Sequence, residues 1–188
     1  HKIYDSAIFH QRGVLFKKIM PIPDHRDSFG SIHDLLLSHG VPGIQGVDTR
    51  DLTRRVREYG TLLCVFGPTD KADVMERLLS KMTPPDHEDL VKSVTIDEPV
   101  IANPGATDDK GQSLPRLAVL DCGIKYNIIR ELCRRFEVVW CPASMPFQEI
   151  MEDWKPDALF ASNGPGDPAH SGTATIARET LAAAVRSD

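Results

Sequence analysis

The chain has 188 residues, of which 41% are apolar and 26% charged, so it is long enough for one large domain or two small ones. A net charge of -5 excludes the general attraction to nucleic acid or anionic membrane that an excess of lysine and arginine provides. No apolar run approaches the roughly 20 residues that cross a bilayer, and the first residues lack a basic-then-apolar signal pattern. We therefore expect a soluble, cytoplasmic protein whose partners are small molecules or other proteins.

The first half of the chain carries short apolar patterns separated by glycine and proline. Ser31 can cap the free N–H groups of a helix, and Pro84 forbids continuation of a later one. The patterns predict helices over residues 31–39, 48–60 and 71–82, and strands over residues 61–66 and 90–96. We expect these elements to form an α+β domain over residues 1–97.

Residues 98–116 are rich in proline, glycine, aspartate, asparagine and serine and offer almost nothing to bury. Such a composition is typical of a linker between two compact units. We therefore place the domain boundary within this segment and begin the second domain at residue 117.

Strand and helix patterns alternate from residue 117 to residue 188. Strands are predicted over residues 117–120, 136–141 and 157–161, each followed by a helix, over residues 124–133, 147–154 and 173–185. This alternation predicts right-handed βαβ crossovers and a parallel sheet covered on both faces. Because a doubly wound sheet normally has about five or six strands, we expect the N-terminal half of such a domain.

The cysteines and histidines form no metal-binding pattern. The four cysteines contain no C-x-x-C pair, and the seven histidines contain no H-E-x-x-H spacing. We predict no metal, and we expect the cysteines to be small buried apolar residues. They are Cys64, Cys122, Cys133 and Cys141.

Ligands of open parallel sheets bind beyond the carboxyl ends of the strands, where this chain has loops at residues 121–123 and 162–168. In the second loop, Gly164 and Gly166 let the backbone approach a ligand closely, whereas Pro165 has no N–H to donate. The remaining amides, those of residues 163, 164, 166 and 167, suit a developing oxyanion or a substrate carboxylate. The alternative is an ordinary tight turn, since Asn-Gly, Pro-Gly and Asp-Pro are common turn dipeptides.

Two other candidates have simpler interpretations. Cys122 lies between a strand and a helix, but a nucleophile elbow needs small residues where this chain has Leu120 and Ile124. The arginines of the second helix form either a solvated face or a contact for an acidic partner surface. They are Arg50, Arg54, Arg55 and Arg57. No phosphate-binding motif of the G-x-x-x-x-G-K-[ST] or G-x-G-x-x-G type is present.

Three stretches of this chain resemble carbamoyl-phosphate synthase amidotransferases, which are class I, Cys-His-Glu glutamine amidotransferases. The stretches follow one another along this chain in the same order as in that family. They are Ser-Asn-Gly-Pro-Gly-Asp-Pro at residues 162–168, Gly-Ile-Gln-Gly-Val-Asp-Thr-Arg-Asp-Leu-Thr-Arg at residues 43–54, and Leu-Asp-Cys-Gly-Ile-Lys-Tyr-Asn at residues 120–127. The stretch at residues 120–127 is closest to the eukaryotic form of the family. Asn-Gly-Pro-Gly-Asp also favours glutamine use, because ammonia-dependent relatives tend to have Gly-Gly-Pro-Gly-Asn.

The resemblance implies an incomplete small-chain N-terminal domain and the N-terminal half of a class I glutamine amidotransferase domain. The complete protein would hydrolyse glutamine and pass ammonia to a synthetase subunit or fused domain, which binds ATP and Mg, for pyrimidine or arginine biosynthesis. The Gly164 amide would stabilise the oxyanion, and Gly166 would contact the glutamine.

No catalytic side chain and no cofactor is expected in this chain. The resemblance places the nucleophilic cysteine within roughly ten residues beyond Asp188, and the histidine and glutamate later, so the chain alone should be inactive. Two alternatives remain: a non-catalytic module that docks a synthetase partner, and a flavodoxin-like domain that binds an anion.

Overall fold

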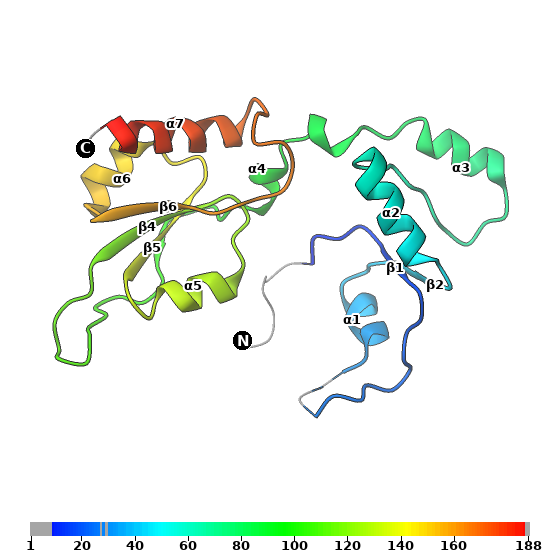
Figure 1. Cartoon of the computed structure of the whole chain (residues 1–188), viewed down its shortest axis with the longest axis horizontal. Helices are drawn as coiled ribbons and strands as arrows, with labels where there is room; N and C mark the ends of the chain where they lie inside the picture. The colour runs from blue at the N-terminus through cyan, green and yellow to red at the C-terminus, as the bar shows by residue number, and fades with distance from the viewer. Residues whose placement is uncertain (1–8, 27, 29, 187–188) are drawn as a thin grey trace. The chain divides into compact units, whose positions relative to one another are not determined.

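The computed structural model describes residues 9–26, 28 and 30–186. The chain divides into two compact units, one over Ile8–Pro84 and the other from Pro85 onward. Figure 1 shows the elements of each unit. Among the described residues, no helix is both long enough and apolar enough to cross a bilayer.

The N-terminal unit contains short elements and little buried apolar surface. Its elements are β1 (Val14–Phe16), α1 (Ile32–Ser38), β2 (Gly43–Gln45), α2 (Thr49–Tyr59) and α3 (Ala72–Leu79), with β1 and β2 paired in parallel. The three predicted helices are confirmed, and the Ser31 side chain caps α1 by accepting from the Asp34 N–H. Leu36 is the one buried apolar residue among those described in this unit.

The strand predicted over residues 61–66 is wrong, because that segment joins no sheet among the described residues. Its apolar composition favours a strand, but a strand also needs a neighbour that accepts its backbone hydrogen bonds. The N-terminal unit instead pairs two three-residue strands, β1 and β2, that we did not predict.

The C-terminal unit is a sheet with helices on both faces. Its elements are a 3-10 turn (Pro85–His87), α4 (Leu90–Val94), β3 (Val100–Ile101), β4 (Arg116–Asp121), α5 (Tyr126–Leu132), β5 (Glu137–Pro142), α6 (Phe147–Trp154), β6 (Ala158–Ala161) and α7 (Thr173–Arg186). The strand order is β3-β5-β4-β6, with β4, β5 and β6 parallel and β3 antiparallel to β5. These strands and helices confirm the predicted alternation and the parallel sheet.

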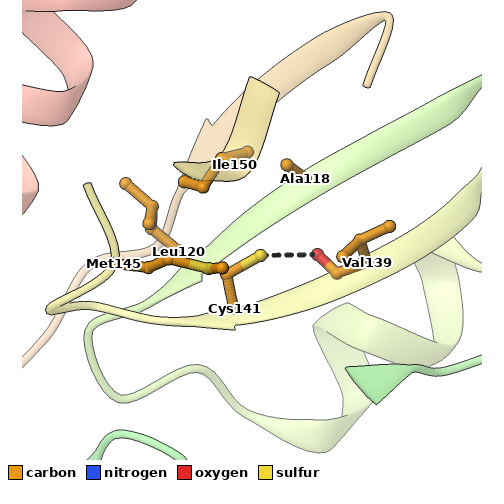
Figure 2. Packing of buried hydrophobic residues seen from close by; sticks show 6 residues of the cluster. All are labelled: Ala118, Leu120, Val139, Cys141, Met145 and Ile150. Atoms are coloured by element: carbon orange, nitrogen blue, oxygen red, sulfur yellow. Dashed lines mark hydrogen bonds between the residues drawn. The ribbon is translucent and has the colours of Figure 1, made fainter. Parts of the chain in front are cut away.

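Alternate residues of β4 explain why both faces are covered. Ala118 and Leu120 pack with Ile150 of α6 on one face, whereas Leu117 and Val119 pack with Ile129 of α5 on the other. In Figure 1, α6 and α7 lie on the face opposite α5. Figure 2 shows the cluster on the α6 side. Strands buried on both faces must be apolar at successive positions, as this strand is.

Two features differ from the sequence-based prediction. The division of the chain falls between Pro84 and Pro85, and the expected linker, residues 98–116, contains β3, which pairs with β5 of the C-terminal unit. The strand predicted over residues 90–96 is instead the helix α4. Asp89 accounts for this helix, because its carboxylate accepts the Lys92 N–H at 3.2 Å and so caps the first turn.

Candidate functional site

The carboxyl ends of β4 and β6 bring the two predicted loops together. The strands are parallel neighbours, so residues 121–123 and 162–168 emerge at the same edge of the sheet. Two hydrogen bonds join them there: the Cys122 N–H donates to Ser162 Oγ at 3.0 Å, and the Ser162 N–H donates to the Leu120 carbonyl at 3.1 Å. The two loops are therefore held next to each other.

Asp121 fixes the shape of the loop that follows β4. Its side chain is 2% exposed and accepts three backbone N–H groups, from Gly123 at 2.9 Å, Ile124 at 2.8 Å and Ile96 at 3.1 Å. A buried carboxylate needs such donors to offset the loss of water. Because its oxygens are already occupied, the role of Asp121 is to hold the backbone.

Gly164 lies against the backbone of Cys122. A Cβ atom at position 164 would overlap the Cys122 carbonyl oxygen, so no side chain fits there. Gly166 is constrained differently, because its φ of 79° belongs to the left-handed region that other residues rarely adopt. Both predicted site glycines are therefore required by the local backbone.

The N–H groups of the second loop are available to a ligand. Within the described part of the chain, no hydrogen bond uses the amides of residues 163, 164, 166 and 167, and these residues are exposed. The sequence predicted these four donors. Unpaired N–H groups at the end of a buried strand are suited to bind a carboxylate or an oxyanion.

A pocket of about 280 Å³ lies beside this loop, close to the lower limit of about 300 Å³ for small-molecule sites. Gly164, Pro165 and Gly166 form one side, with Val91 of α4 and Ala177 of α7 among the other lining residues. A larger open hollow of about 750 Å³, lined by residues of α6 and α7, contains none of the predicted site residues.

Arg178 of α7 anchors the far end of the loop. Its guanidinium donates to the Pro168 carbonyl at 2.7 Å and to Thr175 Oγ1 at 3.1 Å. This arginine also lines the pocket, so it adds positive charge near the unpaired amides. Both contributions favour a negatively charged or polarised ligand oxygen at this edge.

None of the cysteines in this unit has the properties of a reactive thiol. Burial, followed by the negative charge of Asp121, raises the pKa of Cys122, and burial also raises the pKa of Cys133. For Cys141, burial and then Glu149 raise the pKa to about 12. Because the thiolate is the nucleophile, these shifts oppose catalysis and support the structural interpretation of Cys122.

The expectation that all the cysteines are buried is wrong for Cys64, which is exposed, and too strong for Cys133, which is half-buried. Among the described residues, no group of three or more histidine, cysteine, aspartate or glutamate side chains could hold a metal ion.

Sequence reasoning missed two residues that organise the site, Ser162 and Asp89. The position of Ser162, a small polar residue directly after a buried strand, was an available signal. Asp89 precedes Leu90-Val91 in the manner of a helix cap, which also was visible in the sequence.

Comparison with known proteins gives two family matches in the expected order. Residues 1–66 match the carbamoyl-phosphate synthase small chain, CPSase domain, and residues 118–185 match glutamine amidotransferase class-I. The first part of the chain is therefore similar to carbamoyl-phosphate synthase small chains, and the part from residue 118 onward is similar to class-I glutamine amidotransferases. The second match spans β4 to α7 and therefore includes both loops of the candidate site.

Individual relatives cover most of the chain. It is 39% identical to the carbamoyl phosphate synthase small chain of Methanosarcina mazei over 171 residues, which are 88% of this chain and 45% of the relative. It is 35% identical to the multifunctional protein CAD of Squalus acanthias over 169 residues, 89% of this chain and 7% of CAD.

The small chain of Nostoc is 37% identical over 87% of this chain. The chain thus spans less than half the length of the small chains that it matches. The relatives include both separate small chains and a multifunctional protein, so the resemblance to the eukaryotic form stays a prediction.

Proposed function

We propose that the protein containing this chain hydrolyses glutamine and that the ammonia released serves carbamoyl phosphate synthesis. The observation that carries this proposal is the set of unpaired amides at residues 163, 164, 166 and 167, beside a pocket and within the part that matches glutamine amidotransferase class-I. Backbone donors aimed at a developing oxyanion are the usual means of accelerating acyl transfer.

In this proposal a cysteine thiolate attacks the side-chain carboxamide of glutamine, ammonia leaves, and water then hydrolyses the glutamyl thioester. The carboxamide oxygen becomes negatively charged during both steps. The Gly164 N–H would donate to that oxygen, and Gly166 would contact the bound glutamine. Cys122, Cys133 and Cys141 are unsuited to be this nucleophile because their pKa values are raised. We propose that the nucleophile and its histidine and glutamate partners belong to a part of the protein outside these 188 residues.

The ammonia would pass to a synthetase partner. Support comes from the relatives' names, which describe either a small chain or a multifunctional protein. We propose that this partner, a separate subunit or a fused domain, binds ATP and Mg and uses the ammonia for pyrimidine or arginine biosynthesis. We propose that the protein is cytoplasmic.

The direct test is glutamate release from glutamine by the full-length protein with its synthetase partner. We expect hydrolysis together with carbamoyl phosphate formation that accepts either glutamine or free ammonia. If carbamoyl phosphate forms from ammonia but glutamine is not hydrolysed, the proposed glutaminase function is wrong.

A second candidate function is docking of the synthetase through α2. No residue of α2 is buried, and the side chains of Arg50, Arg54 and Arg57 are exposed on its surface. Exposed guanidinium groups pair well with carboxylates of a partner. Replacing Arg54 and Arg57 together by glutamate should weaken association with the synthetase, measured by calorimetry, whereas replacement of Lys81 by glutamate serves as the control. Equal binding by both variants would remove α2 from the interface.

The anion-binding alternative rests on the same unpaired amides. It predicts measurable affinity of the chain for inorganic phosphate, lost in Gly166→Val, without any hydrolysis of glutamine by the full-length protein. Phosphate binding and glutamine hydrolysis are measured separately, so the anion-binding function can be distinguished from the glutaminase function.

A further inference from the structure

We propose that Ser162 is the positioning residue of the oxyanion site: its hydroxyl orients the Asn163–Gly164 peptide so that the Gly164 N–H faces the ligand. This inference rests on the proposed glutaminase function. It assigns to Ser162 a role in catalysis that acts through the backbone, without contact between its side chain and the substrate.

The hydroxyl of Ser162 lies between the two strand-end loops. The residue is 8% exposed, and its Oγ accepts the Cys122 N–H at 3.0 Å. The same hydroxyl donates to the Asn163 carbonyl, also at 3.0 Å. One side chain therefore uses both an acceptor site and its single donor to join the loop after β4 to the loop after β6.

The carbonyl of Asn163 and the N–H of Gly164 belong to the same peptide group. In a planar trans peptide these two groups point in opposite directions. Because Ser162 Oγ holds the Asn163 carbonyl toward the buried side, the Gly164 N–H must point away from it. This agrees with the lack of any partner for that N–H among the residues that the structure describes.

An external contact is needed because glycine does not restrict this peptide by itself. A residue without Cβ adopts positive and negative φ about equally well, so the Asn163–Gly164 peptide could rotate at little cost. Gly164 cannot be replaced by a more restrictive residue, since a Cβ there would overlap the Cys122 carbonyl. The Ser162 hydroxyl supplies the restriction that the residue type at position 164 does not.

Rotation of this peptide would present the Asn163 carbonyl oxygen where the N–H now points. A carbonyl dipole in that place would repel a developing oxyanion, whereas it would affect a neutral bound carboxamide much less. Loss of the hydroxyl should therefore reduce the rate of the chemical step and leave substrate binding nearly unchanged.

The test is Ser162→Ala in the full-length protein with its synthetase partner. We expect kcat for glutamine hydrolysis to fall about 10- to 100-fold, with KM for glutamine changed less than about 3-fold. The ammonia-dependent activity should stay at the wild-type level, because it does not use this site.

Thr180→Val is the matched control. Thr180 is 2% exposed, and its hydroxyl donates to the Met145 carbonyl at 3.1 Å rather than to residues 121–123 or 162–168. Ser162→Ala loses two hydrogen bonds and Thr180→Val loses one, so both variants should unfold at a somewhat lower temperature. Only Ser162→Ala should lose kcat. If Ser162→Ala does not fold, Ser162→Cys, which keeps a weaker donor, should fold and show a reduced kcat with unchanged KM.

The outcomes separate the two proposals. If wild-type protein hydrolyses glutamine and Ser162→Ala (or Ser162→Cys, should the alanine variant not fold) retains wild-type kcat, the positioning role is wrong and the proposed function stands. The positioning role is also wrong, and the proposed function also stands, if Thr180→Val loses as much kcat as Ser162→Ala. If wild-type protein does not hydrolyse glutamine, the proposed function itself fails.

Discussion

The carboxylate of Asp89 accepts both the backbone N–H and the hydroxyl of Thr173, each at 2.9 Å, although 84 positions separate the two residues. The same carboxylate caps α4 through the Lys92 N–H. One side chain thus ties the start of α4 to the start of α7. Val91 of α4 and Ala174 and Ala177 of α7 pack in one cluster and also line the site pocket.

Replacing Asp89 by alanine should destabilise the C-terminal unit. Three hydrogen bonds to one carboxylate are lost, and caps of this kind are each worth about 1 kcal/mol, so we expect the free energy of unfolding to fall by roughly 1–3 kcal/mol. Urea unfolding of the full-length protein measures this. Asp109→Ala, at an exposed position, is the control, and equal stability of the two variants would contradict the role of Asp89.

The contribution of Asp89 should depend on pH. Burial pushes the pKa of its carboxyl up, but hydrogen bonds from Thr173 and Lys92 outweigh this, so the pKa lies below the ordinary value of 3.8. A lowered folded-state pKa means that the stabilisation is complete above the unfolded pKa of about 4 and is lost as the pH falls through the folded-state pKa.

We therefore expect the stability difference between wild type and Asp89→Ala to be constant from about pH 5 to 7 and to shrink below about pH 4. Urea unfolding at a series of pH values measures it. A difference that grows on acidification would mean that the sign of the pKa shift is wrong.

Gly164→Ala should abolish glutamine hydrolysis. Its Cβ would overlap the Cys122 carbonyl, so the loop must move and carry the Gly164 N–H with it. We expect kcat to fall at least about 100-fold and the free energy of unfolding to fall by about 1–3 kcal/mol. Gly67→Ala is the control, because a Cβ at that exposed position would meet the Met75 side chain only at an ordinary contact distance of 4.0 Å. Full activity in the Gly164 variant would show that the loop is a simple turn.

The cysteines should differ in their reactivity toward iodoacetamide. Cys64 is exposed, whereas burial and nearby carboxylates raise the pKa of Cys122 and that of Cys141, the latter to about 12. Because the thiolate reacts, mass spectrometry at pH 8 should find Cys64 alkylated well before the other two. Faster modification of Cys122 would reopen its interpretation as a nucleophile.

Local chemistry was sufficient to predict the alternating elements, and it indicated Gly164 and Gly166 as candidate site residues. The uninterrupted apolar run 117–120 and the helical stripe at 173–185 were recognisable in the sequence, and they correspond to β4 and α7. Gly164 and Gly166 were singled out because glycines at the end of a parallel strand let the backbone approach a ligand, and because this loop resembles that of the carbamoyl-phosphate synthase amidotransferases. The close contact of Gly164 with the Cys122 backbone and the positive φ of Gly166 became evident only in the structure.

Features that depend on distant partners could not be predicted in this way. β3 has only two residues, and it exists because it pairs with β5. The Ser162 hydroxyl acquires its role because β6 lies beside β4 and brings the Cys122 N–H within reach. Residues 90–96 were predicted as a strand from their apolar composition, but the Asp89 cap and the burial of Val91 favour a helix.

The most direct test of the account is a crystal structure of the full-length protein with an electrophilic glutamine analogue bound covalently to its nucleophile. We predict that the oxygen derived from the side-chain carbonyl lies within about 2.7–3.1 Å of the Gly164 nitrogen, with Ser162 still bonded to the Asn163 carbonyl. An adduct whose oxygen is bound elsewhere, with residues 162–168 making no contact to it, would contradict the assignment of this loop.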